Sequence, residues 1–321
     1  MNCFLYQLRF NTPVHFGSSE SALSLYSSED HFRADTLFSA LCHTALQLQG
    51  GDGLEKLLTM AGEGKLLLSD AMPWQGDSFY LPKPFYAAQT ARELPADKRK
   101  AIKKLAWIPV DRFEEYCRAI QSGVLFECEA VSFGNAFETT RAMVPEQGDA
   151  RPYPVGLYRF RENCGLYFLA SLDSPEEEVW LSQLVCALGL SGIGGKISSG
   201  CGKFTVAERF DLRAAAGGQL KWLRDALEGV TGHAMLLTTS LPREEEMEAV
   251  LADASYQLIR RAGFVASDTY ADSPRKKQTQ YYLSAGSVLT NRFSGDLYQI
   301  GSSGAHPVLR YSRPLFLGVT L

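Results

Sequence analysis

Residues 191–203 read Ser-Gly-Ile-Gly-Gly-Lys-Ile-Ser-Ser-Gly-Cys-Gly-Lys, and the order of elements around this loop indicates the architecture. Glycine allows positive φ angles and close approach of a ligand, and successive free N–H groups in such a loop form an anion-binding concavity. Lys196 and Lys203 add positive charge, while Ser198 and Ser199 add hydroxyl donors. The glycines are Gly192, Gly194, Gly195, Gly200 and Gly202. This combination predicts a loop that binds phosphate groups.

The loop does not match either common nucleotide-binding motif. Lys196 is followed by Ile197, so the GxxxxGK[ST] spacing is absent, and Ile197 also stands where GxGxxG needs its third glycine. Both motifs run from a strand into a helix, whereas this loop follows a predicted helix and precedes a predicted strand. A mononucleotide or dinucleotide site is therefore disfavoured. A plain flexible connection is the alternative to phosphate binding.

The segments on either side of the loop carry clear signals. Residues 174–177, Ser-Pro-Glu-Glu, combine a helix cap, proline at the first helical position and an acidic first turn. The helix is expected to run to about Leu188 and to end at Gly189. Apolar patterning predicts one strand at 165–171, before the helix, and another at 204–210, after the loop.

The N-terminal part shows the same alternation of strand and helix. Residues 3–10 alternate as a strand. Residues 36–48 carry apolar side chains at helical spacing, and either Asp35 or Thr36 can cap that helix. A second strand is expected at 65–70.

The stretch from 79 to 145 breaks this rhythm. It contains a proline-containing extended piece and a basic run at 98–104, which favours a solvated helix face. We interpret the stretch as an insertion that projects from the first domain. Without it, the order of elements is β-α-β-β-α-β, which is typical of a ferredoxin-like or RRM-like sheet with helices on one face.

The remaining residues, 211–321, fit a second, degenerate copy of the same plan. Strands are expected at 233–241, 256–267, 280–290 and 306–319, with an acidic helix at 243–253. The sequence therefore predicts an α+β protein with two ferredoxin-like (RRM-like) domains in tandem. The first covers residues 1–210 and carries a thumb-like insertion, and the second covers residues 211–321.

The composition is that of an ordinary globular chain. Its 321 residues are 45% hydrophobic and 21% charged, and the formal net charge is −4. Nucleic-acid binding therefore depends on where Lys and Arg gather rather than on total charge. The seven cysteines are odd in number and lack CxxC spacing, which argues against a disulfide framework and a zinc ribbon. We see no signal peptide and no window near the roughly 20 apolar residues of a membrane span, so a cytoplasmic protein without membrane contact is expected.

The glycine-rich loop, placed just before a strand, resembles the G-rich loop of the RAMP superfamily of CRISPR proteins. Residues 32–41, Phe-Arg-Ala-Asp-Thr-Leu-Phe-Ser-Ala-Leu, resemble the first-helix signature of the fourth subunit of the type III-A (Csm) effector complex, and Val-His-Phe-Gly at 14–17 fits it too. Three more segments resemble that subunit's second half: 260–264 (Arg-Arg-Ala-Gly-Phe), 285–288 (Ala-Gly-Ser-Val) and 306–311 (His-Pro-Val-Leu-Arg-Tyr). The resemblance extends over almost the whole chain and is poorest in the insertion.

This resemblance implies a noncatalytic subunit at the foot of a guide-RNA complex, built of two RRM-like domains and holding the 5′ handle of the crRNA. The implied neighbours are the large Cas10-type polymerase and nuclease subunit and the backbone RAMP subunit. The insertion at 79–145 is implied to contact the backbone subunit as a thumb. Lys196 and Ile197 stand where related loops often carry Arg and Ser, which retains a phosphate contact but loses a hydroxyl.

Basic residues outside the loop are further candidates for RNA contact. Arg260 and Arg261 lie on a predicted strand and point to opposite faces, so one is expected to meet RNA, unless both are simply solvated. The run Arg-Lys-Lys at 275–277 lies beside Tyr281 and Tyr282, which favours phosphate contact combined with base stacking. The full set of candidates is Gly192, Gly194, Gly195, Lys196, Ser198, Ser199, Gly200, Gly202 and Lys203 in the loop, with His31, Arg33, Arg260, Arg261, Arg275, Lys276, Lys277 and Arg310 outside it.

Two other functions remain open. Some RAMP proteins cleave RNA with a histidine near the first helix, and His31, ahead of Arg33, stands at about that place. General acid–base catalysis needs a partner within hydrogen-bond reach, and the sequence does not reveal one. We find no HD pair, no GGDD and no His/Cys cluster, so no metal, cofactor or catalytic residue is expected. The third interpretation is a protein-binding scaffold in which the loop only connects elements.

Overall fold

A computed structural model describes residues 2–17, 25–86, 104–124, 126–143, 149–229, 232–267, 269–301 and 304–321. The first half is built on one antiparallel sheet. Its elements are β1 (Asn2–Phe10), α1 (Ala34–Gly62), β3 (Met72–Gln75), β8 (Cys164–Leu172), α4 (Pro175–Ser191) and β9 (Phe204–Asp211). The strands lie in the order β3-β8-β1-β9, and every neighbouring pair is antiparallel. This is the predicted β-α-β-β-α-β connectivity.

Most local predictions for this half are confirmed. The hydroxyl of Ser174 accepts the Glu177 N–H at 3.2 Å, and the Glu177 carboxylate accepts the Ser174 N–H at 3.1 Å. This capping box starts α4 where the sequence placed it. The helix expected at 36–48 is also present, but α1 continues to Gly62 across a kink at Gly50, whose φ is 67°. The short β2 (Leu67–Leu68) pairs with β8 in the region of the expected second strand.

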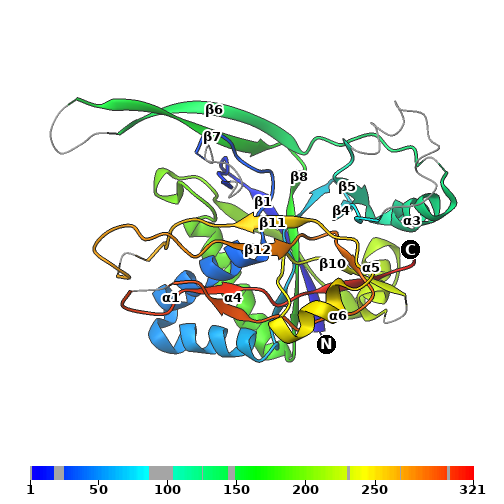
Figure 1. Cartoon of the computed structure of the whole chain (residues 1–321). Coiled ribbons are helices and arrows are strands. Elements are labelled where there is room, and N and C mark those ends of the chain that lie inside the picture. Colours follow the sequence, from blue (N-terminus) through cyan, green and yellow to red (C-terminus); the bar gives the residue numbers. More distant parts are fainter. Residues whose placement is uncertain are drawn as a thin grey trace.

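The boundaries predicted for the insertion are wrong at both ends. Its first residues form β4 (Ser78–Pro82), which pairs with β3, and β5 (Trp107–Pro109) extends the same sheet. The element that projects is a hairpin of β6 (Gly134–Met143) and β7 (Arg151–Phe160), which extends well beyond the body of the molecule (Figure 1). Between β5 and β6 lie η2 (Val110–Arg112) and α3 (Phe113–Ser122). Residues 87–103, with most of the basic run, lie outside the described residues.

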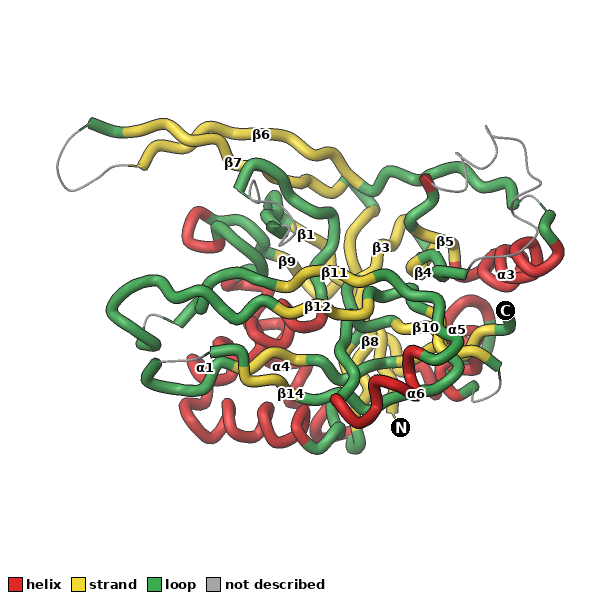
Figure 2. Tube along the Cα trace, viewed as in Figure 1, coloured by secondary structure: helices red, strands yellow, loops and turns green. Residues whose placement is uncertain are grey.

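The second half consists of short elements joined by turns and loops (Figure 2). They are η4 (Leu212–Ala214), α5 (Gly218–Glu228), β10 (His233–Leu236), η5 (Glu244–Glu246), α6 (Met247–Leu251), β11 (Leu258–Arg261), β12 (Gln280–Leu283), β13 (Val288–Leu289), β14 (Leu297–Gln299), β15 (Leu309–Tyr311) and β16 (Phe316–Val319). Three strands form the sheet β13-β10-β16, while β11-β12 and β14-β15 are separate pairs.

The second half does not repeat the whole plan of the first. In the described residues, the chain between β13 and β16 forms β14 and β15 and no helix. The sequence analysis also missed α5, although Leu220, Leu223 and Leu227 give it an apolar stripe at helical spacing. None of the helices in the described ranges is long and apolar enough to span a membrane.

The two halves share their hydrophobic interior around β8. All nine residues of β8 are buried, and its alternate side chains point to opposite faces. Phe168 belongs to a cluster with α1 and α4, whereas Tyr167 belongs to a cluster with Met235 of β10. Figure 1 shows α1 and α4 on one side of β8 and β10 and α5 on the other. The boundary at 210/211 stays a prediction, and the packing does not divide there.

Arg313, beyond β15, fastens the second half to the end of α1. It is 6% exposed, and its guanidinium donates to the carbonyl oxygens of Ala61 at 3.0 Å, Gly62, and Gly295 at 3.0 Å. Carbonyl groups at the end of a helix lack intrahelical partners, and this contact gives those of Ala61 and Gly62 a charged donor from the second half. Nearby, the Tyr311 hydroxyl donates to the Leu66 carbonyl oxygen at 3.1 Å.

Candidate nucleic-acid groove

The glycine-rich loop joins α4 to β9 and includes η3 (Ile197–Ser199). Two of its glycines are required by the backbone and by space together. Gly202 has φ of 78°, and a Cβ there would lie 2.1 Å from the Ile193 carbonyl oxygen. Gly194 has φ of 95°, and a Cβ would lie 2.8 Å from the His15 carbonyl oxygen. The loop therefore folds tightly against the segment that follows β1.

The predicted string of bare loop amides is wrong, because most of these N–H groups are already bonded within the protein. Gly195 donates to the His15 carbonyl oxygen at 2.8 Å and Gly202 donates to that of Pro13 at 2.9 Å. The N–H groups of Gly192, Ile193, Ser199, Gly200, Cys201 and Lys203 also have internal acceptors. Among the described residues, those of Gly194, Lys196, Ile197 and Ser198 have no partner. Any anion binding therefore depends chiefly on side chains beside the loop.

A groove of about 560 Å³ lies beside the loop, and we call it the glycine-loop groove. It is lined by the first turns of α1, residues 15–17, the glycine-rich loop, Arg261 of β11, Lys277 and Arg310. It brings together candidates that are far apart in sequence: His31, Arg33, Gly192, Gly194, Gly195, Arg261, Lys277 and Arg310. Both halves of the chain thus contribute to one concave surface.

The other sequence candidates do not line this groove. Lys196 lies over the Tyr153 ring of β7, 4.9 Å from its centroid, and therefore contacts the projecting hairpin. Arg260 lies on the face of β11 opposite to Arg261, as the strand prediction required. The candidates outside the groove are Lys196, Ser198, Ser199, Gly200, Gly202, Lys203, Arg260, Arg275 and Lys276.

Asp35 organises the charges at the floor of the groove. Its carboxylate accepts three hydrogen bonds from the Arg261 guanidinium, the shortest 2.6 Å, and lies 3.6 Å from Nε of Arg310. Burial alone would raise the pKa of Asp35, but the charges of Arg261 and Arg310 hold it below the ordinary value. One carboxylate therefore serves two guanidinium groups and leaves an excess of positive charge.

The remaining charges add to this excess. Arg33 contacts Glu29 at 2.5 Å, while Lys277 lies close enough to Arg261 and Arg310 to be repelled by them. Burial lowers the pKa of Lys277, as do the two guanidinium groups, although Asp35 opposes them. Among the described residues, four basic and two acidic side chains line the groove, so it favours an anionic ligand.

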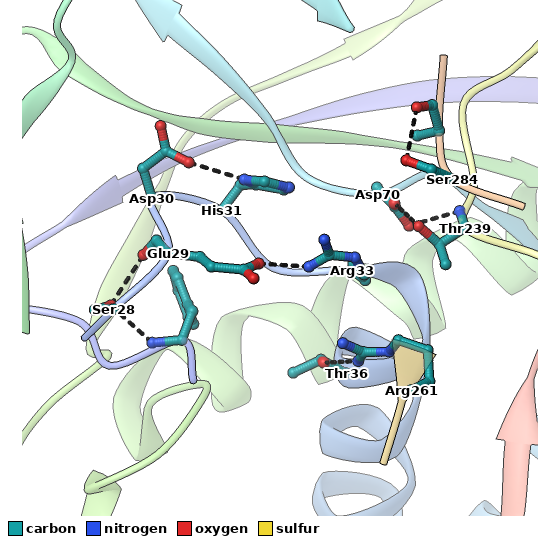
Figure 3. Close-up of polar contacts among 12 residues, drawn as sticks. Ser28, Glu29, Asp30, His31, Arg33, Thr36, Asp70, Thr239, Arg261 and Ser284 are labelled. Atoms are coloured by element: carbon teal, nitrogen blue, oxygen red, sulfur yellow. Dashed lines mark hydrogen bonds and ion pairs between the residues drawn. The ribbon is translucent and has the colours of Figure 1, made fainter. Parts of the chain in front are cut away.

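Asp70 fixes the start of α1, and the sequence analysis missed it. The cap predicted at Asp35 or Thr36 is wrong, because the helix begins at Ala34, whose N–H donates to the buried Asp70 carboxylate at 2.9 Å. The Thr239 hydroxyl from the second half donates to the same carboxylate at 2.6 Å. Burial raises the pKa of Asp70, while the charge of Arg33 and these hydrogen bonds oppose the rise. Figure 3 shows Asp70 between Arg33 and Thr239.

His31 has a partner that the sequence analysis did not identify. Its Nδ1 lies 2.8 Å from the Asp30 carboxylate (Figure 3). Its ring meets the Trp107 ring edge to face, with 5.2 Å between the centroids. His15, which was not among the sequence candidates, also lines the groove and packs against Gly195 of the loop. Its place in Val-His-Phe-Gly at 14–17 was the available signal.

Comparisons with known proteins decide the family. Residues 230–319 match the family model described as the CRISPR Csm4 C-terminal domain. The chain is 35% identical to the CRISPR system Cms protein Csm4 of Mycobacterium tuberculosis over 320 residues, which are 99% of this chain and 98% of that protein. The chain belongs to the Csm4 family. The Csm4 protein of Streptococcus thermophilus is 31% identical, with 97% of each chain covered.

Chains in solved structures that contain Csm4 have the same fold. The chain matches a chain of the structure described as the Csm3-Csm4 subcomplex in the type III-A CRISPR-Cas interference complex, with a TM-score of 0.65 and 18% identity over 100% of both chains. A Csm1-Csm4 cassette in complex with cA4 gives a TM-score of 0.62 and 20% identity, covering 100% of this chain and 99% of that one. The predicted assignment to the fourth Csm subunit is confirmed by the sequence relatives.

Proposed function

We propose that the chain is a noncatalytic RNA-binding subunit of a type III-A complex and holds the 5′ handle of the crRNA in the glycine-loop groove. One observation carries this proposal: Arg33, Arg261, Lys277 and Arg310 come from both halves of the chain and converge on one surface with excess positive charge. Arg and Lys neutralise backbone phosphates, and single-stranded RNA offers both phosphates and unstacked bases. Csm4-family membership supports the choice of crRNA as ligand.

The proposal includes two protein partners and a tandem fold. Solved structures with the same fold are described as a Csm1-Csm4 cassette and a Csm3-Csm4 subcomplex. This chain is therefore expected to join a large Cas10-type subunit to a backbone subunit. The β6–β7 hairpin is the part that projects far enough to act as a thumb against the backbone subunit (Figure 1). The second half is proposed to derive from a second ferredoxin-like domain of which β10, α6, β13 and β16 are the remnant.

Replacing Lys277 by alanine tests the groove directly. We expect Lys277→Ala to weaken binding of handle RNA on the order of tenfold, because a charge-assisted contact is lost. The slope of log affinity against log salt should fall by about 0.7, the value for one contact on a single strand. A salt titration of the full-length chain with a synthetic handle RNA measures both.

Lys221→Ala is the matched control for that experiment. Lys221 lies on α5, outside the groove, and its ammonium group contacts Asp225 at 2.7 Å. The control should leave affinity and slope unchanged. An unaltered slope in Lys277→Ala would contradict the proposed site.

A second candidate function, metal-independent RNA cleavage, is favoured by the contact between His31 and Asp30. A carboxylate can orient a histidine for general acid–base catalysis. Our proposal expects the purified chain to leave repeat RNA intact in the presence of a chelator, and His31→Ala to behave identically. Cutting by the native chain that disappears in His31→Ala would establish the endoribonuclease instead.

A further inference from the structure

His15 lies on the wall of the groove and is 7% exposed. Its Nδ1 lies 2.7 Å from the carbonyl oxygen of Gly156 on β7. A carbonyl oxygen has no proton to donate, so Nδ1 carries the hydrogen in this contact. In the neutral ring the other nitrogen, Nε2, is then a hydrogen-bond acceptor. The contact with β7 therefore fixes both the orientation of the ring and its tautomer.

The acceptor at Nε2 is unused within the protein. Nε2 has no hydrogen-bond partner among the residues that the structure describes, and it is not one of the buried unpaired side-chain atoms there, so it is open to the groove. Gly195 leaves this edge of the ring uncovered: a Cβ at 195 would lie 2.6 Å from Cδ2 of His15, the atom bonded to Nε2. The φ of Gly195 lies outside the left-handed region, so the backbone does not require glycine there. The lack of a side chain matters for access to His15.

The chemistry of Nε2 is opposite to that of the basic side chains around it. Arg33, Arg261 and Arg310 only donate hydrogen bonds, so they suit phosphate oxygens, which cannot donate to Nε2. The nucleotide groups that donate are the ribose 2′-hydroxyl and the N–H groups of the bases. A group of this kind, held beside the phosphates, would complete the hydrogen bonding of His15.

We propose that Nε2 of His15 accepts a hydrogen bond from a nucleotide donor in the glycine-loop groove, and that His15 is thereby a specificity-determining residue. The inference rests on the proposed RNA-binding function. A ribose 2′-hydroxyl as the donor makes the site selective for RNA over DNA, and a base N–H makes it selective for a base.

Binding of modified RNA to the full-length chain tests this inference. The probes are a synthetic handle oligoribonucleotide, a set with one 2′-deoxy substitution each, and a set with one base N–H removed each, such as inosine for guanosine. One modification should weaken binding to the native chain about three- to tenfold, the value of one hydrogen bond. The set that contains it identifies the donor.

The same modification should have no effect on His15→Phe, which keeps a ring but has no acceptor. Because that variant also loses the bond to Gly156, Gly195→Ala is the second test, since it keeps both nitrogens and obstructs Nε2. It should become insensitive to the same modification. His233→Phe on β10, outside the groove, is the control and should keep the sensitivity of the native chain.

Each outcome decides the matter. Equal losses in the native chain, His15→Phe and Gly195→Ala, or no sensitive position at all, would overturn the role of His15 while leaving RNA binding intact. Failure of the native chain to bind unmodified RNA would overturn the proposed function as well, and is recognised before any modified RNA is used.

Discussion

Asp35→Asn is expected to lower the free energy of unfolding by about 3–5 kcal/mol. The substitution keeps the volume of the side chain but removes the charge that Arg261 and Arg310 share. The side chains of Asp35 and Arg261 are each 12% exposed and that of Arg310 is 4% exposed, so water cannot replace the lost partner. The large effect comes from the uncompensated guanidinium groups rather than from the worth of the ion pair itself.

Chemical denaturation at neutral pH measures this loss, and pH provides a second check. The folded-state pKa of Asp35 is lowered, so its contribution is complete above the ordinary value of 3.8 and is lost as pH falls below it. The difference between the native chain and Asp35→Asn should therefore shrink in acid. Asp225→Asn is the matched control, because it removes an exposed carboxylate that also contacts two basic groups. It should change the free energy of unfolding little. Equal effects of the two substitutions would contradict the buried network.

Arg313→Ala is expected to lower the free energy of unfolding by about 3–5 kcal/mol. The backbone oxygens that Arg313 contacts, including two at the end of α1, lose a charged donor. The substitution removes charge-assisted hydrogen bonds to three carbonyl oxygens, those of Ala61, Gly62 and Gly295, and bonds of this kind contribute about 1.5–3 kcal/mol each. Alanine also leaves a space where the guanidinium and its stem were packed. Thermal or denaturant unfolding followed by circular dichroism gives the value.

Arg313→Lys distinguishes charge from geometry. Lysine keeps the positive charge but lacks the planar fork that reaches several oxygens at once, so it should recover only part of the lost stability. Full recovery by lysine would show that charge alone matters at this position. A change in Arg313→Ala no larger than that of an exposed arginine would show that the contact with α1 is unimportant.

Local signals predicted the first half of the fold well. The capping box at Ser174 and the alternation at 3–10 depend on neighbouring residues, and the structure confirms both. The insertion was misplaced because β4 and β5 are short strands with prolines at their ends, and their strand character comes from pairing with β3 rather than from their own pattern. The start of α1 was misplaced for a similar reason, since its cap is Asp70, which is distant in sequence.

Several candidate residues from distant parts of the sequence lie together in the structure, and their role in RNA binding stays a prediction. Arg33, Arg261, Lys277 and Arg310 were selected from separate motifs, and the fold places them on one groove. The internal bonding of most loop amides could not be foreseen, because glycine content indicates only that a loop can turn sharply. The acceptors for Gly195 and Gly202 come from His15 and Pro13, and no local pattern in the loop reveals such contacts.

The continuous packing around β8 has a thermodynamic consequence for recognition. Phe32 and Ile193 near the loop and Tyr311 beside Arg310 belong to one buried cluster, so these parts of the proposed RNA site are already ordered without a ligand. The unfavourable entropy of association then arises mainly from immobilising the RNA strand, rather than from ordering the protein groove. A preorganised receptor of this kind can hold a short segment tightly with few contacts.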